Sequence, residues 1–105
     1  GAVLSLAKAL AYEAGPYGIT VNAILPGWVR TPKVEQVAAD SRPEDPEGAM
    51  RDMAGFIPLG RLCRVEEIGD LVAFLASDDA KYITGTEMVI DGGSTLPETF
   101  NILHA

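Results

Sequence analysis

A Pro-Gly pair followed by a threonine is the feature of this sequence best suited to bind a ligand. Pro26-Gly27 ends an apolar stretch, and the residues that follow are Trp28, Val29, Arg30 and Thr31. Glycine lets a backbone approach a ligand closely, and a threonine hydroxyl can donate to an amide oxygen or a phosphate. The pattern predicts a ligand-binding loop over residues 26–31, although a simple turn is the commoner meaning of such a pattern.

The other reactive side chains favour structural roles. Cys63 is the single cysteine, which excludes an intrachain disulfide or a cysteine-built zinc site, and we expect a half-buried apolar side chain. His104, the single histidine, lies near the chain end, where solvation or packing on a partner is expected. We expect Arg61 to pair with a carboxylate and Asp91 to close a turn. No catalytic residue and no metal ligand is predicted in this chain.

Two helices flank the strands that would position the loop. Residues Gly1–Ala14 predict a helix that is apolar on more than one side, with a polar stripe at Ser5, Lys8 and Tyr12, and Gly15-Pro16 ends it. Residues Val65–Ser77 predict a second helix from the spacing of Ile68, Leu71, Val72 and Leu75.

Two strands complete the expected elements. Ile19–Leu25 is apolar on both faces, which is typical of a strand covered on both sides in a parallel sheet. Thr86–Ile90 is the second strand, ended by Asp91-Gly92-Gly93. The order of helix, strand, variable loop or helices, helix and strand predicts an α/β fold, the C-terminal half of a doubly wound parallel sheet. In such sheets, ligands bind at the carboxyl ends of strands, which is where residues 26–31 fall.

The segment Lys33–Gly55 has two interpretations. It is polar and interrupted by prolines, with one short helix expected before the prolines and another around Ala49–Ala54. A solvated connection and a flap over a binding site are equally consistent with this composition.

Length and charge restrict the class of protein. A chain of 105 residues is enough for one domain. A net charge of −7 argues against nucleic acid or an anionic membrane as the main partner. No apolar run reaches the length of a membrane span, and the N-terminal residues make a poor signal peptide. A single cysteine suits a reducing compartment, so we expect a cytoplasmic location.

Six segments together carry a family resemblance. They are Ile19–Gly27 with Thr31, Pro58–Arg61, Glu66–Ile68, Phe74–Asp78, Tyr82–Gly85 and Val89–Gly93. Their order and spacing resemble the C-terminal half of the classical short-chain dehydrogenases/reductases, over residues 1–94. The resemblance implies a partial NAD(P)-binding Rossmann-like domain. Its parts would be residues 1–31 for the helix, strand and nicotinamide-side loop, 33–55 for the variable substrate loop, 58–93 for the last helix and strand, and 94–105 for a tail.

The resemblance also implies roles for the loop. Pro26 and Gly27 would lie beside the nicotinamide of NAD or NADP, the backbone of Val29 would hold the carboxamide, and the Thr31 hydroxyl would bind the carboxamide or the diphosphate. Cys63 stands where the family often has Gly, Val65 where it often has Pro, and Gly69 where it often has Ala. These departures affect the last helix and not the proposed cofactor contacts.

Two elements of the family pattern are absent from these residues. There is no Gly-rich phosphate loop and no Tyr-x-x-x-Lys, and by the resemblance the chain begins one residue after the proton-relay lysine. Cleavage after that lysine and truncation are the two expectations for this start. Tyr12 and Lys8 share one stripe, which favours a surface role over replacement of the missing pair.

The whole enzyme would transfer hydride between nicotinamide and a carbonyl or alcohol substrate, whereas the chain alone is expected to be inactive. Its expected partners are the missing N-terminal half or another copy of the chain, in a homodimer or homotetramer. The alternative is a non-catalytic assembly module derived from the same fold.

Overall fold

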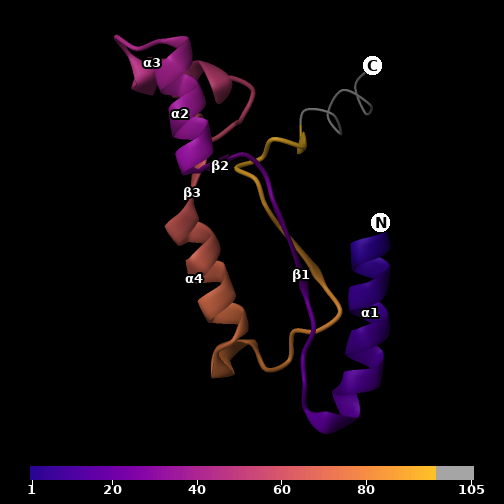
Figure 1. The fold of residues 1–105 in the computed structure, drawn as a ribbon. Coiled ribbons are helices and arrows are strands. Elements are labelled where there is room, and N and C mark those ends of the chain that lie inside the picture. Colours follow the sequence, from indigo (N-terminus) through magenta and orange to yellow (C-terminus); the bar gives the residue numbers. More distant parts are fainter. Residues whose placement is uncertain (97–105) are drawn as a thin grey trace. The chain divides into compact units, whose positions relative to one another are not determined.

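The computed structural model describes residues 1–96, which contain four α-helices and four short strands (Figure 1). Contacts divide the chain into two compact units, Gly1–Leu25 with Gly69–Val89 and Pro26–Ile68 with Ile90–Ala105. No helix within residues 1–96 is long and apolar enough to cross a membrane. His104 and the tail beyond residue 96 lie outside the described residues.

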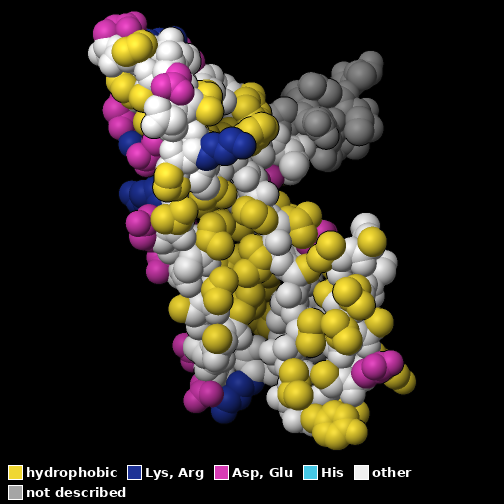
Figure 2. Space-filling view, in the orientation of Figure 1, with side chains coloured by type: hydrophobic (Ala, Val, Ile, Leu, Met, Phe, Trp, Pro, Cys, Tyr) yellow, Lys and Arg dark blue, Asp and Glu magenta, His cyan; other side chains and the backbone are white. Residues whose placement is uncertain are grey.

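In the first unit, α1 spans Ala2–Ala14, which confirms the predicted helix. A short 3₁₀ turn at Gly15–Tyr17 follows, so the helical path continues slightly past Gly15-Pro16 before it ends. The side chains that α1 buries are small, while Val3, Leu6 and Leu10 are exposed to 69%, 61% and 45%. Hydrophobic side chains are visible over this helix in Figure 2. Exposed apolar area of this extent is unfavourable in water.

Strand β1 is Ala23–Pro26, so the prediction of a strand beginning at Ile19 is wrong at its start. The residues before β1 are held by side chains and by isolated hydrogen bonds rather than by a regular strand ladder. The N–H of Val21 donates to Thr84 Oγ1 at 3.0 Å, and Asn22 Oδ1 accepts from the Thr86 N–H at 3.1 Å. Polar side chains that satisfy backbone groups in this way compete with regular strand pairing.

Strand β4 is Glu87–Ile90, and it pairs with β1 in a two-stranded sheet. Ala23 N–H donates to Thr86 C=O, and Gly27 N–H donates to Ile90 C=O. The residue numbers rise together on both sides, which is the register of parallel strands. Parallel pairing of the two predicted strands is thereby confirmed, and their carboxyl ends lie at the same edge.

Helix α4 spans Val65–Leu75 and confirms the predicted second helix, which ends two residues earlier than expected. Ser77 ends the helical path, since its side chain accepts from the Asp79 N–H and caps a 3₁₀ turn at Asp78–Ala80. Glu66 and Glu67 lie in the first turn of α4, where the helix dipole favours negative charge.

Replacing Gly69 with alanine is expected to stabilise α4. A Cβ built at this position has nothing within 4 Å, so the methyl group meets open space. Alanine in a helix interior is more favourable than glycine by about 0.5–1 kcal/mol. We expect Gly69→Ala to raise the urea midpoint of the chain without changing the slope. A lower midpoint would contradict the helical, uncrowded environment of Gly69.

Within residues 26–68 and 90–96, the second unit contains two very short strands, two helices and the first turn of α4. Strands β2 (Val29–Arg30) and β3 (Cys63–Arg64) pair in parallel, with Val29 opposite Cys63. Helix α2 is Pro32–Ser41 and helix α3 is Pro46–Met53. The structure thus places two helices in the segment 33–55, and both begin with Pro at the first helical position, where its missing N–H costs no hydrogen bond.

Helices α2 and α3 pack on each other through a small core. Its members are the buried residues Ala38, Ala49, Met50, Ala54, Ile57 and Leu62, with Val34 and Met53 packed against them. Alanines at the contact allow the two helix backbones to approach closely. The segment 33–55 is therefore a folded helical pair with buried residues, and of the two interpretations the plain solvated connection does not describe it.

Candidate functional site

The loop Pro26–Thr31 begins at the last residue of β1 and is fixed by backbone hydrogen bonds on two sides. The N–H of Gly27 donates to the C=O of Ile90 at 3.0 Å, and the N–H of Cys63 donates to the C=O of Trp28 at 2.9 Å. The four predicted cofactor-binding residues, Pro26, Gly27, Val29 and Thr31, thus lie in one continuous segment at the carboxyl end of parallel strands. Tyr12 and Lys8 belong to α1 in the other unit.

Gly27 is required by a close approach within the protein. A Cβ built on Gly27 would lie 2.7 Å from the Cβ of Asp91 and 2.9 Å from its Cα. Such separations are shorter than van der Waals contact, so every other residue type would force the two segments apart. Sequence reasoning anticipated a close approach here but assigned it to a ligand; in the structure, the neighbour is the turn after β4.

The backbone of Val29 is available on the side opposite β3. Val29 lies opposite Cys63, and the N–H of Cys63 donates to the C=O of Trp28. In a parallel ladder with this register, the C=O of Trp28 and the N–H of Arg30 point toward β3. The N–H and C=O of Val29 consequently face the other way. One donor beside one acceptor is complementary to a carboxamide, which carries one acceptor oxygen and a donor NH₂.

Thr31 is the N-cap residue of α2. Its Oγ1 accepts from the Val34 N–H at 3.2 Å, and its backbone is extended, as is usual for an N-cap. The hydroxyl proton is not used by this bond and can be donated to a further acceptor. The capping bond therefore fixes the position of a hydroxyl donor two residues after Val29.

Arg30 ties the loop to both helices of the second unit. Its guanidinium donates to Glu35 Oε1 at 3.1 Å and to both carboxylate oxygens of Glu47, at 3.1 and 2.7 Å. The hydrogen bonds that Arg30 donates, to Glu47 first and then to Glu35, raise the pKa of Arg30, and the bond to Glu47 lowers the pKa of Glu47. The guanidinium of Arg30 thus links the loop to α2 and α3.

Asp91 closes the turn after β4, as predicted. Its Oδ1 accepts from the Gly93 N–H at 2.8 Å, and its Oδ2 accepts from the Thr95 hydroxyl at 2.9 Å. These hydrogen bonds lower the pKa of Asp91, and the largest contribution is the bond from the Gly93 N–H. Gly92 and Gly93 have φ of +63° and +91°, a region that side-chain-bearing residues rarely adopt, so the Gly-Gly pair permits this turn.

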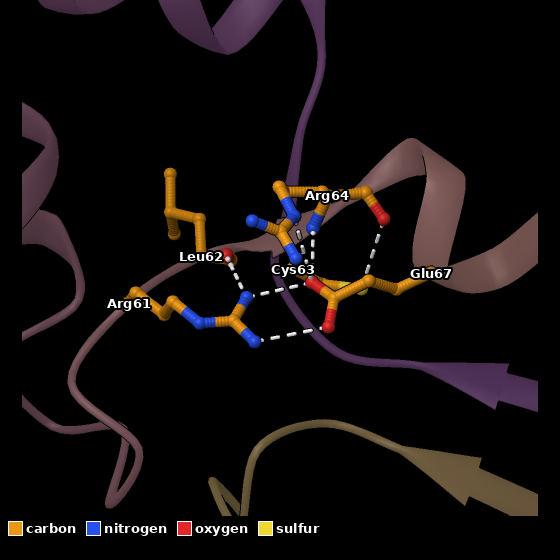
Figure 3. Close-up of polar contacts among 5 residues, drawn as sticks. All are labelled: Arg61, Leu62, Cys63, Arg64 and Glu67. Carbon is orange, nitrogen blue, oxygen red and sulfur yellow. Dashed lines mark hydrogen bonds and ion pairs between the residues drawn. The ribbon is translucent and has the colours of Figure 1, made fainter.

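Arg61 pairs with a carboxylate, as predicted, and the partner is Glu67 (Figure 3). Arg61 Nη1 and Nη2 donate to the two carboxylate oxygens of Glu67 at 2.6 and 2.9 Å. The backbone N–H of Arg64 donates to the same carboxylate at 3.0 Å. Glu67 thus supplies one half of a capping box at the start of α4, which compensates for the poor N-cap residue Arg64.

Acid should weaken this start of α4. The hydrogen bonds from Arg61 and then from the Arg64 N–H lower the pKa of Glu67 from about 4.5 to about 2. A carboxylate whose pKa is lower in the folded state stabilises the fold fully above pH about 4.5, and this stabilisation is lost as the pH falls through about 2. We expect Glu67→Gln to flatten the stability profile in this window, measured as urea midpoints from pH 2 to 6. Glu66→Gln, a neighbour that the pairing does not include, is the control. Identical profiles for Glu67→Gln and the unmodified chain would contradict the pairing.

Cys63 lies half-buried opposite Val29, as expected for a small apolar residue. Burial, as the largest cause, raises the pKa of the Cys63 thiol, which favours the unreactive protonated form.

An apolar cavity of about 450 Å³ opens beside the loop. Its lining residues come from the loop, α2, the end of α3 and the segment after α3: Trp28, Val29, Lys33, Val34, Val37, Met53, Phe56 and Leu62. The rings of Trp28 and Phe56 meet edge to face, with centroids 6.0 Å apart. Trp28 and Val29 belong to the predicted ligand-binding loop, and Lys33 belongs to the segment 33–55 that the resemblance assigns to the substrate. Sequence reasoning missed Phe56, whose signal was the apolar residues that follow α3.

Parallel strands whose carboxyl ends meet beside a loop and a cavity define a partial Rossmann-like α/β domain. A family model described as enoyl-(acyl carrier protein) reductase matches residues 1–95. The oxidoreductase UcpA of Escherichia coli O157:H7 is 56% identical over 101 residues, which are 96% of this chain and 38% of that protein. The chain thus spans well under half the length of this relative.

Solved structures agree with the sequence matches. A short-chain dehydrogenase family protein from Francisella tularensis superposes with a TM-score of 0.77 at 35% identity, over 91% of this chain and 41% of that one. L-sorbose reductase from Gluconobacter frateurii, solved with NADPH and L-sorbose, superposes with a TM-score of 0.78 at 31% identity, over 89% of this chain and 37% of that one. The chain belongs to the short-chain dehydrogenase/reductase family.

Proposed function

We propose that this chain forms the nicotinamide-binding side of an NAD(P)-dependent oxidoreductase that acts on a carbonyl or alcohol substrate. The observation that carries the proposal is the outward-facing peptide of Val29, followed two residues later by the hydroxyl of Thr31. This donor and acceptor set fits the carboxamide of a nicotinamide ring. The solved relative with bound NADPH supports a nicotinamide cofactor for this fold.

The chain's own residues would bind the cofactor and orient its nicotinamide ring. Val29 would accept from the carboxamide NH₂ and donate to its oxygen, while Thr31 would donate its hydroxyl proton to the carboxamide or the diphosphate. Pro26 and Gly27 would lie beside the ring, and the apolar wall with Trp28 would exclude water from it. When bound, the cofactor would supply the hydride to a carbonyl substrate or accept it from an alcohol substrate. Proton transfer requires a Tyr-x-x-x-Lys outside these residues, so we expect the 105 residues alone to be inactive.

Substitutions of Thr31 test the proposal, because they separate its capping bond from its hydroxyl donor. Thr31→Ser keeps both, Thr31→Asp keeps the cap but loses the donor, and Thr31→Val loses both. In a protein reconstituted from this chain and an N-terminal half, NAD(P)H oxidation is measured against cofactor concentration. We expect Thr31→Asp to raise the cofactor KM about threefold to tenfold at wild-type stability. Thr31→Ser should stay within twofold, by roughly the same energetic scale.

A wild-type cofactor KM for Thr31→Asp would overturn the assigned role of Thr31. Saturable cofactor binding by the reconstituted protein would exclude a purely non-catalytic assembly module, whereas its absence would favour that alternative.

The exposed side chains of α1 support a second part of the proposal, that this helix packs against the remainder of the domain or another copy of the chain. Val3, Leu6 and Leu10 would form the contact. We expect sedimentation velocity to show concentration-dependent association of the isolated chain, reduced by Leu6→Lys. Leu6 is a better target than buried Ala7, since its substitution leaves the unit's own packing intact. A compact monomer at all concentrations would contradict this part.

A further inference from the structure

The cavity beside the loop favours a ligand with an apolar body. Seven of its eight lining residues are apolar, and its volume of about 450 Å³ lies within the range of small-molecule sites. Trp28 and Phe56 remain 59% and 51% exposed although they contact each other edge to face. A ligand that covers these two rings would remove a large apolar area from water.

Lys33 is the one charged residue in the cavity wall. Each arginine in residues 1–96 has a carboxylate within 4.0 Å, whereas Lys33 has none in that range. Lys33 also lies in the first turn of α2, where the helix dipole disfavours a positive charge. The position of Lys33 is therefore poor for helix stability and favourable for attracting an anion into an otherwise apolar site.

The two features impose a joint requirement on the ligand. An uncharged apolar molecule would leave the ammonium of Lys33 beside the cavity without a counterion. A small polar anion would leave the aromatic side chains of the cavity wall exposed to water. A molecule with an apolar body and one carboxylate satisfies both. Figure 2 shows basic and hydrophobic side chains next to one another over α2.

We propose that the cavity binds the substrate of the proposed oxidoreductase, and that this substrate is a carbonyl compound with an aromatic or alicyclic body and a carboxylate that pairs with Lys33. This inference rests on the proposed function for the carbonyl group. The preference for an apolar carboxylate rests on the cavity alone, and Lys33 is its specificity-determining residue.

Trp28 provides the measurement, because it is the only tryptophan of the chain and forms part of the cavity wall. The full 105-residue chain is titrated with 3-phenylpropanoate and with its neutral amide, 3-phenylpropanamide, while Trp28 fluorescence is followed. We expect the carboxylate to bind about fivefold more tightly than the amide, as for a single ion pair near the surface. The difference should shrink as salt is added.

Variants at lysine separate charge from shape. Lys33→Met keeps an unbranched apolar stem and removes the charge, so the two probes should bind equally, with the affinity for the amide unchanged. Lys8→Met is the matched control: it makes the same change of net charge on α1, in the other unit, and should retain the preference. Circular dichroism of each variant verifies that the helices are intact.

Three outcomes would overturn the inference. They are equal affinity for the two probes in the unmodified chain, a preference that survives in Lys33→Met, and no saturable response of Trp28. If the probes bind only to a chain shortened to residues 1–96, the tail rather than a substrate is the ligand of the cavity, and the inference is overturned as well. A parallel cofactor titration of the reconstituted protein separates the cases: if it succeeds while the probes fail, only the substrate inference falls.

Discussion

Replacing Gly27 with alanine should destabilise the protein by about 1–3 kcal/mol, the usual cost of forcing extra volume into a packed site. The added Cβ would lie 2.7 Å from the Cβ of Asp91 and 2.9 Å from its Cα. Since the second of these atoms belongs to the backbone, the strain cannot be relieved by rotating a side chain. The hydrogen bond from the Gly27 N–H to Ile90 would lengthen as the segments separate.

The measurement is a urea unfolding series with Gly69→Ala as the matched control. Both variants add one methyl group to a glycine, but Gly69 has open space around it, so the two changes should have opposite signs. Gly27→Ala should also raise the cofactor KM of the reconstituted protein, because the displaced loop carries Val29. Wild-type stability of Gly27→Ala would show that the two segments are not in close contact.

Replacing Met50 with alanine should cost about 2–4 kcal/mol, through lost burial and the cavity left behind. Met50 is 5% exposed and is the largest side chain contributed by α3 to the core shared with α2. Its removal would loosen the packing that holds the wall of the apolar cavity. We expect a lower urea midpoint and weaker binding of both phenylpropanoid probes.

Met53→Ala is the control on the same helix. Met53 is only partly buried and lines the cavity, so its truncation should change probe binding while costing much less stability. Equal losses of stability for the two variants would mean that the α2–α3 core is not centred on Met50.

The elements that follow from local pattern could be predicted from the sequence. The spacing of Ile68, Leu71 and Leu75 reports one helix face directly, so α4 needed no knowledge of its neighbours. The start of β1 could not be predicted in this way. Whether Ile19 joins a ladder depends on residues that approach from far along the chain, and there the Thr84 hydroxyl and Asn22 take over the backbone bonds.

The candidate site, likewise, could be predicted from the sequence only where its features depend on neighbouring residues. The Pro26-Gly27 pair indicates a sharp change of direction and a close approach, and both are present. The identity of the close neighbour, Asp91, depends on the pairing of β1 with β4 and is not encoded near Gly27. The role of Arg30 depends likewise on where α3 carries Glu47. Lys33 could be assigned only to the variable segment 33–55, because its place in a cavity wall depends on how α2, α3 and the segment after α3 come together.

The hydrogen bonds of the loop also set an order for biosynthesis. The N–H of Gly27 donates to the C=O of Ile90, and the C=O of Trp28 accepts from the N–H of Cys63, so each hydrogen bond waits for a partner translated much later. At ribosomal speeds of about 5–20 residues per second, the nascent loop spends on the order of seconds without its partners. Contacts so distant in sequence also close slowly. The loop Pro26–Thr31 consequently gains these bonds only after the chain has been translated as far as Ile90, and until then its apolar residues are open to chaperones and proteases.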